Sequence, residues 1–158
     1  MDLIKKYEDI DKYQMIINFF KSMNLYDEEY FKYINSQTKI YNIPYFEIKD
    51  FVGCYPIIKM DKIVEFNIIL PKLNTIFDVL IYIHEYSHAL DIEDEYEIFP
   101  NLMEAIFLVD YLKDDELIRQ QIKSIRIELD NNKSEKHKIG KNIKLKTKIV
   151  WTIHLNSI

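Results

Sequence analysis

The chain has 158 residues, 48% of them hydrophobic and 14% aromatic, which supplies enough apolar surface for a packed core and excludes global disorder. Its length fits one domain, residues 1–158. A net charge of -5 argues against nucleic acid as a partner, and one cysteine, Cys54, excludes an intrachain disulfide. No apolar run approaches about 18 residues and no apolar segment follows the acidic N-terminus, so we expect a cytoplasmic protein without membrane contact or secretory signal.

Helices are predicted in the first part of the chain and strands in the next. Apolar residues at helical spacing indicate one helix over residues 3–22 and a second over 27–36, with Tyr30, Phe31 and Ile34 facing inward. Between residues 38 and 70, β-branched and aromatic residues alternate with turn formers. This pattern predicts short strands, the last near Ile63–Leu70 and stopped by Pro71.

The second half of the chain is mainly helical in its pattern. Asn74 is a plausible N-cap for a helix whose apolar stripe runs from Ile76 to Leu90. Further helices are predicted over residues 96–113, with Pro100 in the first turn, and over 115–129. Residues 130–142 read as a loop, and 143–158 as a strand. The expected fold class is α+β: a small mixed or antiparallel sheet packed on one side by helices.

One motif carries a specific chemistry. His84-Glu85-Tyr86-Ser87-His88 places two histidines four residues apart, and on a helix both imidazoles then point to the same place. Two such nitrogens are the ligands that a catalytic Zn²⁺ site requires, with one position left for water. Glu85 lies beside that position, where it can take a proton from the water and pass it to a leaving amine. The motif therefore predicts amide hydrolysis.

A catalytic zinc site also needs a third protein ligand. No histidine follows the motif before His137, so a carboxylate on the next helix is the natural choice. Glu97 and Glu104 are the candidates, and their separation of seven residues puts them on one helical face about 10 Å apart. A further donor is needed for the oxyanion of the transition state, and His154 in the C-terminal segment is the candidate for this catalytic role.

The motif resembles a known family. His84-Glu85-Tyr86-Ser87-His88-Ala89-Leu90 is similar to the zinc motif of the thimet oligopeptidase and oligoendopeptidase F family, a gluzincin-type branch of the zincin metallopeptidases. The segment from Glu97 to Glu104 is similar to that family's second ligand helix, with Pro100 where the family has Ser. The resemblance implies His84, His88 and Glu97 as ligands, Glu85 as general base and Glu104 as a carboxylate that holds a ligand histidine. Met103-Glu104-Ala105-Ile106 instead resembles thermolysin-like zincins, which keeps Glu104 as the alternative ligand.

The resemblance covers residues 76–112 and implies a minimal zincin-like domain. Such a domain has a small sheet with an edge strand beside the active-site helix and a second helix that carries a ligand. Zincins often bind an extended peptide along that edge, and Ile63–Leu70 is the candidate strand, with an interior strand as the other interpretation.

Four functions are consistent with these patterns. The first is a zinc-dependent metallopeptidase that acts on a peptide, and the second is a narrow variant that cuts one protein partner. The third is a non-catalytic zinc-binding regulatory or interaction module, although such a site does not need Glu85. The fourth is a helical scaffold without metal, whose stability would not respond to a chelator. The sequence does not specify the substrate or the oligomeric state.

Overall fold

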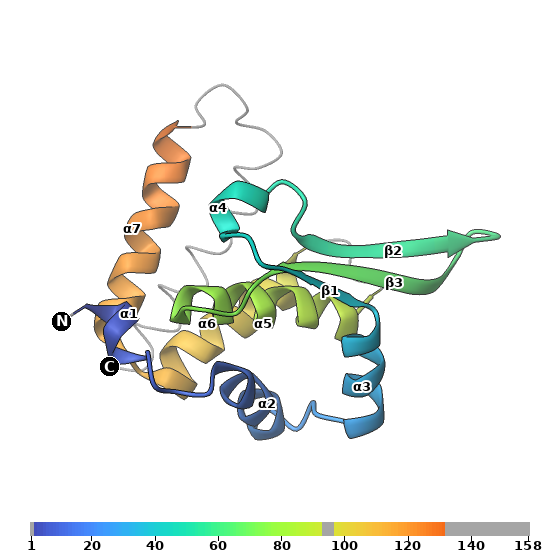
Figure 1. Ribbon diagram of the computed structural model, residues 1–158, viewed down its shortest axis with the longest axis horizontal. Helices are drawn as coiled ribbons and strands as arrows, with labels where there is room; N and C mark the ends of the chain where they lie inside the picture. The colour runs from blue at the N-terminus through green and yellow to red at the C-terminus, as the bar shows by residue number, and fades with distance from the viewer. Residues whose placement is uncertain (1, 93–96, 132–158) are drawn as a thin grey trace. The chain divides into compact units, whose positions relative to one another are not determined.

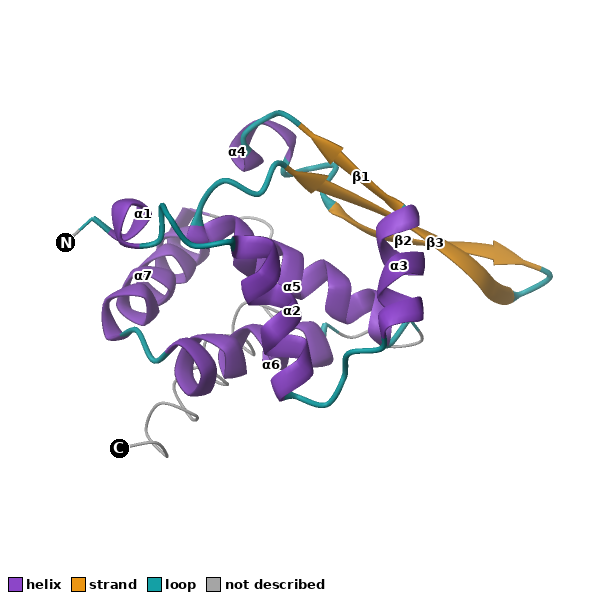
Figure 2. Ribbon diagram, turned by 60° about the horizontal axis from the view of Figure 1, so that its bottom comes forward, coloured by secondary structure: helices purple, strands orange, loops and turns teal. Residues whose placement is uncertain are grey.

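The computed structural model describes residues 2–92 and 97–131 of the chain. The chain divides into two compact units, Met1–Glu95 and Tyr96–Ile158. The first unit combines helices with a three-stranded sheet, and the described part of the second is helical (Figures 1 and 2). The predicted α+β class is therefore confirmed.

The N-terminal segment forms two helices where we predicted a single one over residues 3–22. Helix α1 covers Leu3–Lys6 and α2 covers Lys12–Ser22. The carboxylate of Asp11 accepts a hydrogen bond of 2.9 Å from the backbone N–H of Gln14 and so begins α2 as an N-cap. The apolar spacing continues across this break, which is why periodicity alone did not reveal it.

Helix α3 covers Glu28–Ser36, in agreement with the predicted residues 27–36. Asp27 is its N-cap and accepts a hydrogen bond of 2.7 Å from the backbone N–H of Tyr30. Phe31 and Ile34 are buried, as predicted.

The sheet has three strands in the order β1-β3-β2. Strand β1, Thr38–Tyr41, runs parallel to β3, Lys62–Pro71, whereas β2, Gly53–Lys59, is antiparallel to β3. A tight turn at Met60 and Asp61, both with positive φ, joins β2 to β3 as a hairpin. Strand β3 ends at Pro71, as the sequence predicts.

Both interpretations of Ile63–Leu70 hold in part, and one strand prediction is wrong. The segment lies in β3, which is interior at Ile68, since this residue pairs with Thr38 on one side and with Cys54 on the other. Among the described residues, 63–67 pair with β2 alone. The wrong prediction concerns Tyr45–Ile48, which forms the short helix α4 because Pro44 fixes a φ of -59° at its start.

The predicted motif lies on helix α5, Ile76–Leu90. Thr75, not the predicted Asn74, is its N-cap. The Thr75 hydroxyl accepts from the backbone N–H of Asp78 at 3.3 Å, and the Asp78 carboxylate accepts from the backbone N–H of Thr75 at 2.7 Å. This capping box fixes the first turn of α5. Strands β2 and β3 pack on one side of α5 and α2 packs on another (Figure 2).

Aromatic rings connect the helices of the first unit. Phe20 on α2 lies 5.3 Å from Phe31 on α3, and Phe31 lies 6.1 Å from Tyr86 on α5, measured between ring centroids. Each of these rings is almost fully buried. Since such contacts stabilise beyond the area that they bury, they fix α5 against its neighbours.

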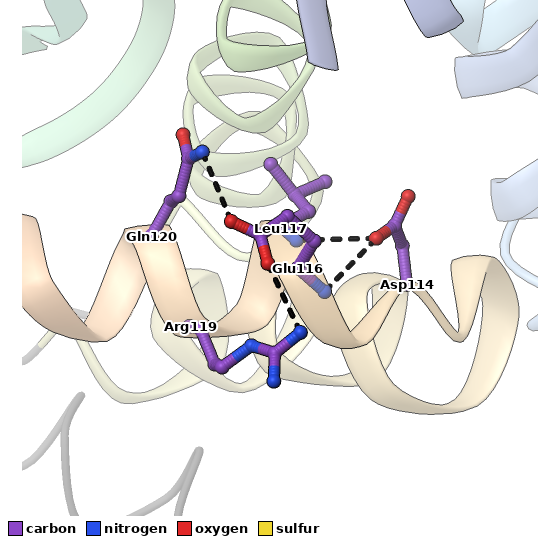
Figure 3. Close-up of polar contacts among 5 residues, drawn as sticks. All are labelled: Asp114, Glu116, Leu117, Arg119 and Gln120. Atoms are coloured by element: carbon purple, nitrogen blue, oxygen red, sulfur yellow. Dashed lines mark hydrogen bonds and ion pairs between the residues drawn. The ribbon is translucent and has the colours of Figure 1, made fainter. Parts of the chain in front are cut away.

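The second unit contains helices α6, Ile98–Ile106, and α7, Asp115–Asn131, with a π-helix, η1, at Phe107–Leu112 between them. Pro100 lies in the first turn of α6, as predicted. The side chain of Asp114 accepts hydrogen bonds of 3.1 Å from the backbone N–H groups of Glu116 and Leu117 and so caps α7 (Figure 3).

The helix predicted over 115–129 is confirmed and continues to Asn131, so residues 130 and 131, which were predicted as loop, are helical. Other predictions concern residues outside the described ranges. The rest of that loop, the strand predicted for 143–158 and His154 are not among the described residues. In the described part of the chain, no helix combines the length and the apolarity that crossing a bilayer requires.

Candidate metal centre

The two histidines of the motif lie one turn apart on α5. Their ring centroids are 4.9 Å apart, with 72° between the ring planes, and both side chains are partly exposed. Residues four apart on a regular helix share a face, so the geometry follows directly from the spacing that the sequence predicts.

The residues inside the motif serve the packing of the helix. Tyr86 is buried and its hydroxyl donates a hydrogen bond of 2.9 Å to the side-chain oxygen of Asn35 on α3. The Ser87 hydroxyl, fully buried, donates to the backbone carbonyl of Ile83 at 2.6 Å. A tyrosine and a small residue at these positions therefore keep α5 in contact with the core.

Glu85 is 8% exposed, which is unusual for a carboxylate and places its charge largely out of water. Burial raises the pKa of the Cys54 thiol on β2 to about 12, and the negative charge of Glu85 adds to this shift. Cys54 is therefore a neutral thiol at pH 7 and no nucleophile.

Glu97 has an unusual backbone. Its φ of 60° and ψ of 5° lie in the left-handed region, which a residue with a Cβ adopts only at a cost of about 1 kcal/mol or more. One ligand atom from each of His84, His88 and Glu97 lies within 4.8 Å of the others, and all three side chains are partly exposed. Among the described residues, this is the single such group of histidines, cysteines and carboxylates, and Glu104, which is 4% exposed, is not part of it.

Tyr30 contacts the C-terminal end of α5, and the sequence did not predict this contact. Tyr30, which was predicted to face inward, is partly buried, and its hydroxyl donates a hydrogen bond of 2.6 Å to the backbone carbonyl of Ala89, directly after His88. Burial raises the pKa of Tyr30, and the nearby Tyr33 and Cys54 add to the shift, so the hydroxyl stays a donor at neutral pH. This bond occupies one of the carbonyls that the end of a helix leaves without a helical partner.

The donor set has a defined chemistry. Two imidazole nitrogens and one carboxylate oxygen form a set that suits zinc and related divalent ions and leaves a coordination position for water. Protein-family models, curated proteins and solved structures give no match to this chain.

Proposed function

We propose that the chain is a zinc-dependent metallopeptidase in which His84, His88 and Glu97 hold the metal and Glu85 is the general base. The observation that supports this most is the grouping of two histidines from a His-Glu-x-x-His helix with one later carboxylate within 4.8 Å. A purely structural zinc site usually has four protein ligands and no adjacent base.

The metal, the general base and the sheet edge would each have a separate role in the proposed reaction. When bound, a zinc ion supplies a Lewis acid that polarises a carbonyl and lowers the pKa of water to about 7. Glu85, which is fixed on the same helix and largely shielded from solvent, would accept a proton and then donate it to the amine that leaves. An extended peptide would pair with a sheet edge, and β2 is the described edge strand that packs on α5.

The test compares metal content and activity in a set of variants. Protein purified without a metal-affinity tag would be assayed by elemental analysis as wild type, His84→Ala and Glu85→Gln. His137→Ala removes a histidine that we assign no role and is the matched control. We expect about one zinc per chain in wild type, Glu85→Gln and His137→Ala, and little in His84→Ala.

A quenched-fluorescence peptide library then tests turnover. We expect Glu85→Gln to lower the cleavage rate by a factor of about 100 or more while zinc stays bound, because the general base is lost. Zinc without any cleavage of peptides or proteins would support the non-catalytic module instead. No zinc in wild type, even after reconstitution, would contradict both functions.

A further inference from the structure

A second site lies on another face of α5, within the first unit. It is a pocket of about 530 Å³ whose walls come from α2, α3, β1, α5 and the residues just after β3. Two tyrosines of α5, Tyr82 and Tyr86, contribute to these walls. A pocket of this volume falls in the range of small-molecule sites, about 300–1,000 Å³.

The pocket is separate from the candidate metal centre. Successive residues of an α-helix are rotated by about 100°, so the pair Tyr82 and Tyr86 lies nearly opposite the pair His84 and His88. None of the three candidate metal ligands lines the pocket. Occupancy of one site therefore does not require occupancy of the other.

The polar groups of the pocket are already ordered. The Tyr82 hydroxyl donates to the backbone carbonyl of Pro71 at 2.7 Å, and the Tyr86 hydroxyl donates to the side-chain oxygen of Asn35 at 2.9 Å. The side-chain amide of Asn35 in turn donates to the Tyr13 hydroxyl at 2.5 Å. The Tyr13 hydroxyl, which accepts this bond, can still donate its own proton to a ligand.

The charges of the pocket favour an anion. Lys12 is only 9% exposed, and its ammonium donates to the backbone carbonyls of Glu8 and Ile10 at 3.2 and 3.3 Å. An ammonium has three donors, so one remains, and no described carboxylate forms an ion pair with Lys12. A buried charge of this kind gains from an opposite charge that joins it.

Two further charged residues line the pocket, and they limit the charge of the ligand. Lys72 is exposed and adds a second cation, whereas the carboxylate of Asp11 is held by the backbone N–H of Gln14. Two lysines and one aspartate give the lining a net charge of +1, which matches a ligand with a single negative charge. Ile40 and Leu73 also line the pocket and provide apolar contact for the body of the ligand.

We propose that this pocket binds a small organic monocarboxylate with a flat apolar body. The carboxylate would accept hydrogen bonds from the remaining donor of Lys12 and from Lys72. The body would pack against the exposed ring of Tyr13 and the aliphatic side chains of Ile40 and Leu73, which offer both stacking and apolar contact.

The test uses a matched pair of probes with the full chain: naphthalene carboxylate and the uncharged naphthalene carboxamide. Isothermal titration calorimetry would measure affinity, and amide chemical shifts of the labelled protein would locate the site. We expect saturable binding of the carboxylate with shifts at Asn35 and Tyr86, and affinity for the carboxamide lower by about tenfold or more. Equal affinity for the two probes, or shifts elsewhere, would overturn the proposal.

Variants provide the second criterion. Lys12→Gln and Lys72→Gln should each weaken carboxylate binding several-fold, whereas Lys62→Gln, at the exposed first residue of β3, should leave it unchanged. If Lys12→Gln does not fold, the affinity of Lys72→Gln for the carboxylate still tests the proposal, because Lys72 is exposed. His84→Ala should bind the probe as wild type does, so that failure of the metal centre and failure of this pocket are distinguishable. Unchanged affinity in Lys72→Gln would contradict the proposed contact.

Discussion

The two helical segments that carry the candidate ligands are built in opposite ways. Helix α5 is regular over 15 residues, begins with a reciprocal capping box and has a buried face in contact with the sheet. The segment α6–η1 begins at a left-handed residue without a side-chain cap, contains Pro100 and changes to π-helix at Phe107. Helix α5 follows the usual capping and backbone preferences of an α-helix. The segment α6–η1 departs from these preferences at both of its ends.

The two segments therefore position their candidate ligand side chains in different ways. On α5, the distance between the histidines depends only on the helical repeat, so packing and capping need only keep the helix intact. For Glu97, the position depends on a strained backbone conformation, a feature that is often found at functional sites. The histidine pair should therefore tolerate changes around it, provided α5 remains folded, whereas the carboxylate should not.

The largest expected effect on stability concerns the buried face of α5. Ile83 is fully buried, and Ile83→Ala should lower the free energy of unfolding by about 3 kcal/mol, because it leaves a cavity in a packed core. The matched control is Ile98→Ala in the first turn of α6, where the side chain is 50% exposed and the expected loss is below about 0.5 kcal/mol. Urea unfolding followed by circular dichroism measures both. Similar losses for the two variants would contradict the contrast between the segments.

The next prediction concerns the choice of carboxylate. If Glu97 is the third ligand as proposed, Glu97→Gln should weaken zinc binding by about a hundredfold or more, because it would remove the anionic ligand, whereas Glu104→Gln should change it by about tenfold at most. Competition with a chromophoric chelator measures both affinities. Both substitutions keep the size of the side chain, so packing changes little. A larger loss in Glu104→Gln than in Glu97→Gln would show that the alternative ligand is the correct one.

The sequence predicted the features that depend on local rules. The His-Glu-x-x-His spacing, a helix that carries it and the first-turn position of Pro100 all follow from propensity and periodicity. The capping box was also readable as Thr75-Ile76-Phe77-Asp78, although Asn74 was chosen instead. These features depend on residues within four positions of one another.

Most of the features that the sequence did not predict depend on contacts between residues that are far apart in the sequence. The central place of β3 requires the parallel partner β1, more than 20 residues earlier, and no local pattern identifies that pairing. The resemblance favoured Glu97 over Glu104, but no pattern predicted the left-handed backbone of Glu97, a conformation that a glutamate rarely adopts. Tyr30 reaches Ala89 across 59 positions. His154 remains a prediction.

A smaller effect is expected at the first turn of α5. Thr75→Ala removes the hydroxyl that accepts from the Asp78 backbone, which should lower the free energy of unfolding by about 1 kcal/mol. Thr75→Ser keeps the hydroxyl and should stay close to wild type. The histidine pair should retain zinc in both variants under folding conditions. A loss of zinc in Thr75→Ala without unfolding would mean that capping itself positions the ligands.

The smallest effect lies at the end of η1 and has the opposite sign. Lys113 has a φ of 55°, and its backbone N–H donates to the carbonyl of Leu108 at 3.1 Å, five residues earlier. Lys113→Gly should raise the free energy of unfolding by about 0.5 kcal/mol, because glycine adopts this conformation without steric strain although it gains entropy in the unfolded chain. Lys113→Ala removes the same side chain but keeps the Cβ, so it should give no stabilisation. If alanine stabilises as much as glycine in urea unfolding, the gain comes from the lost lysine side chain and not from relief of the left-handed backbone.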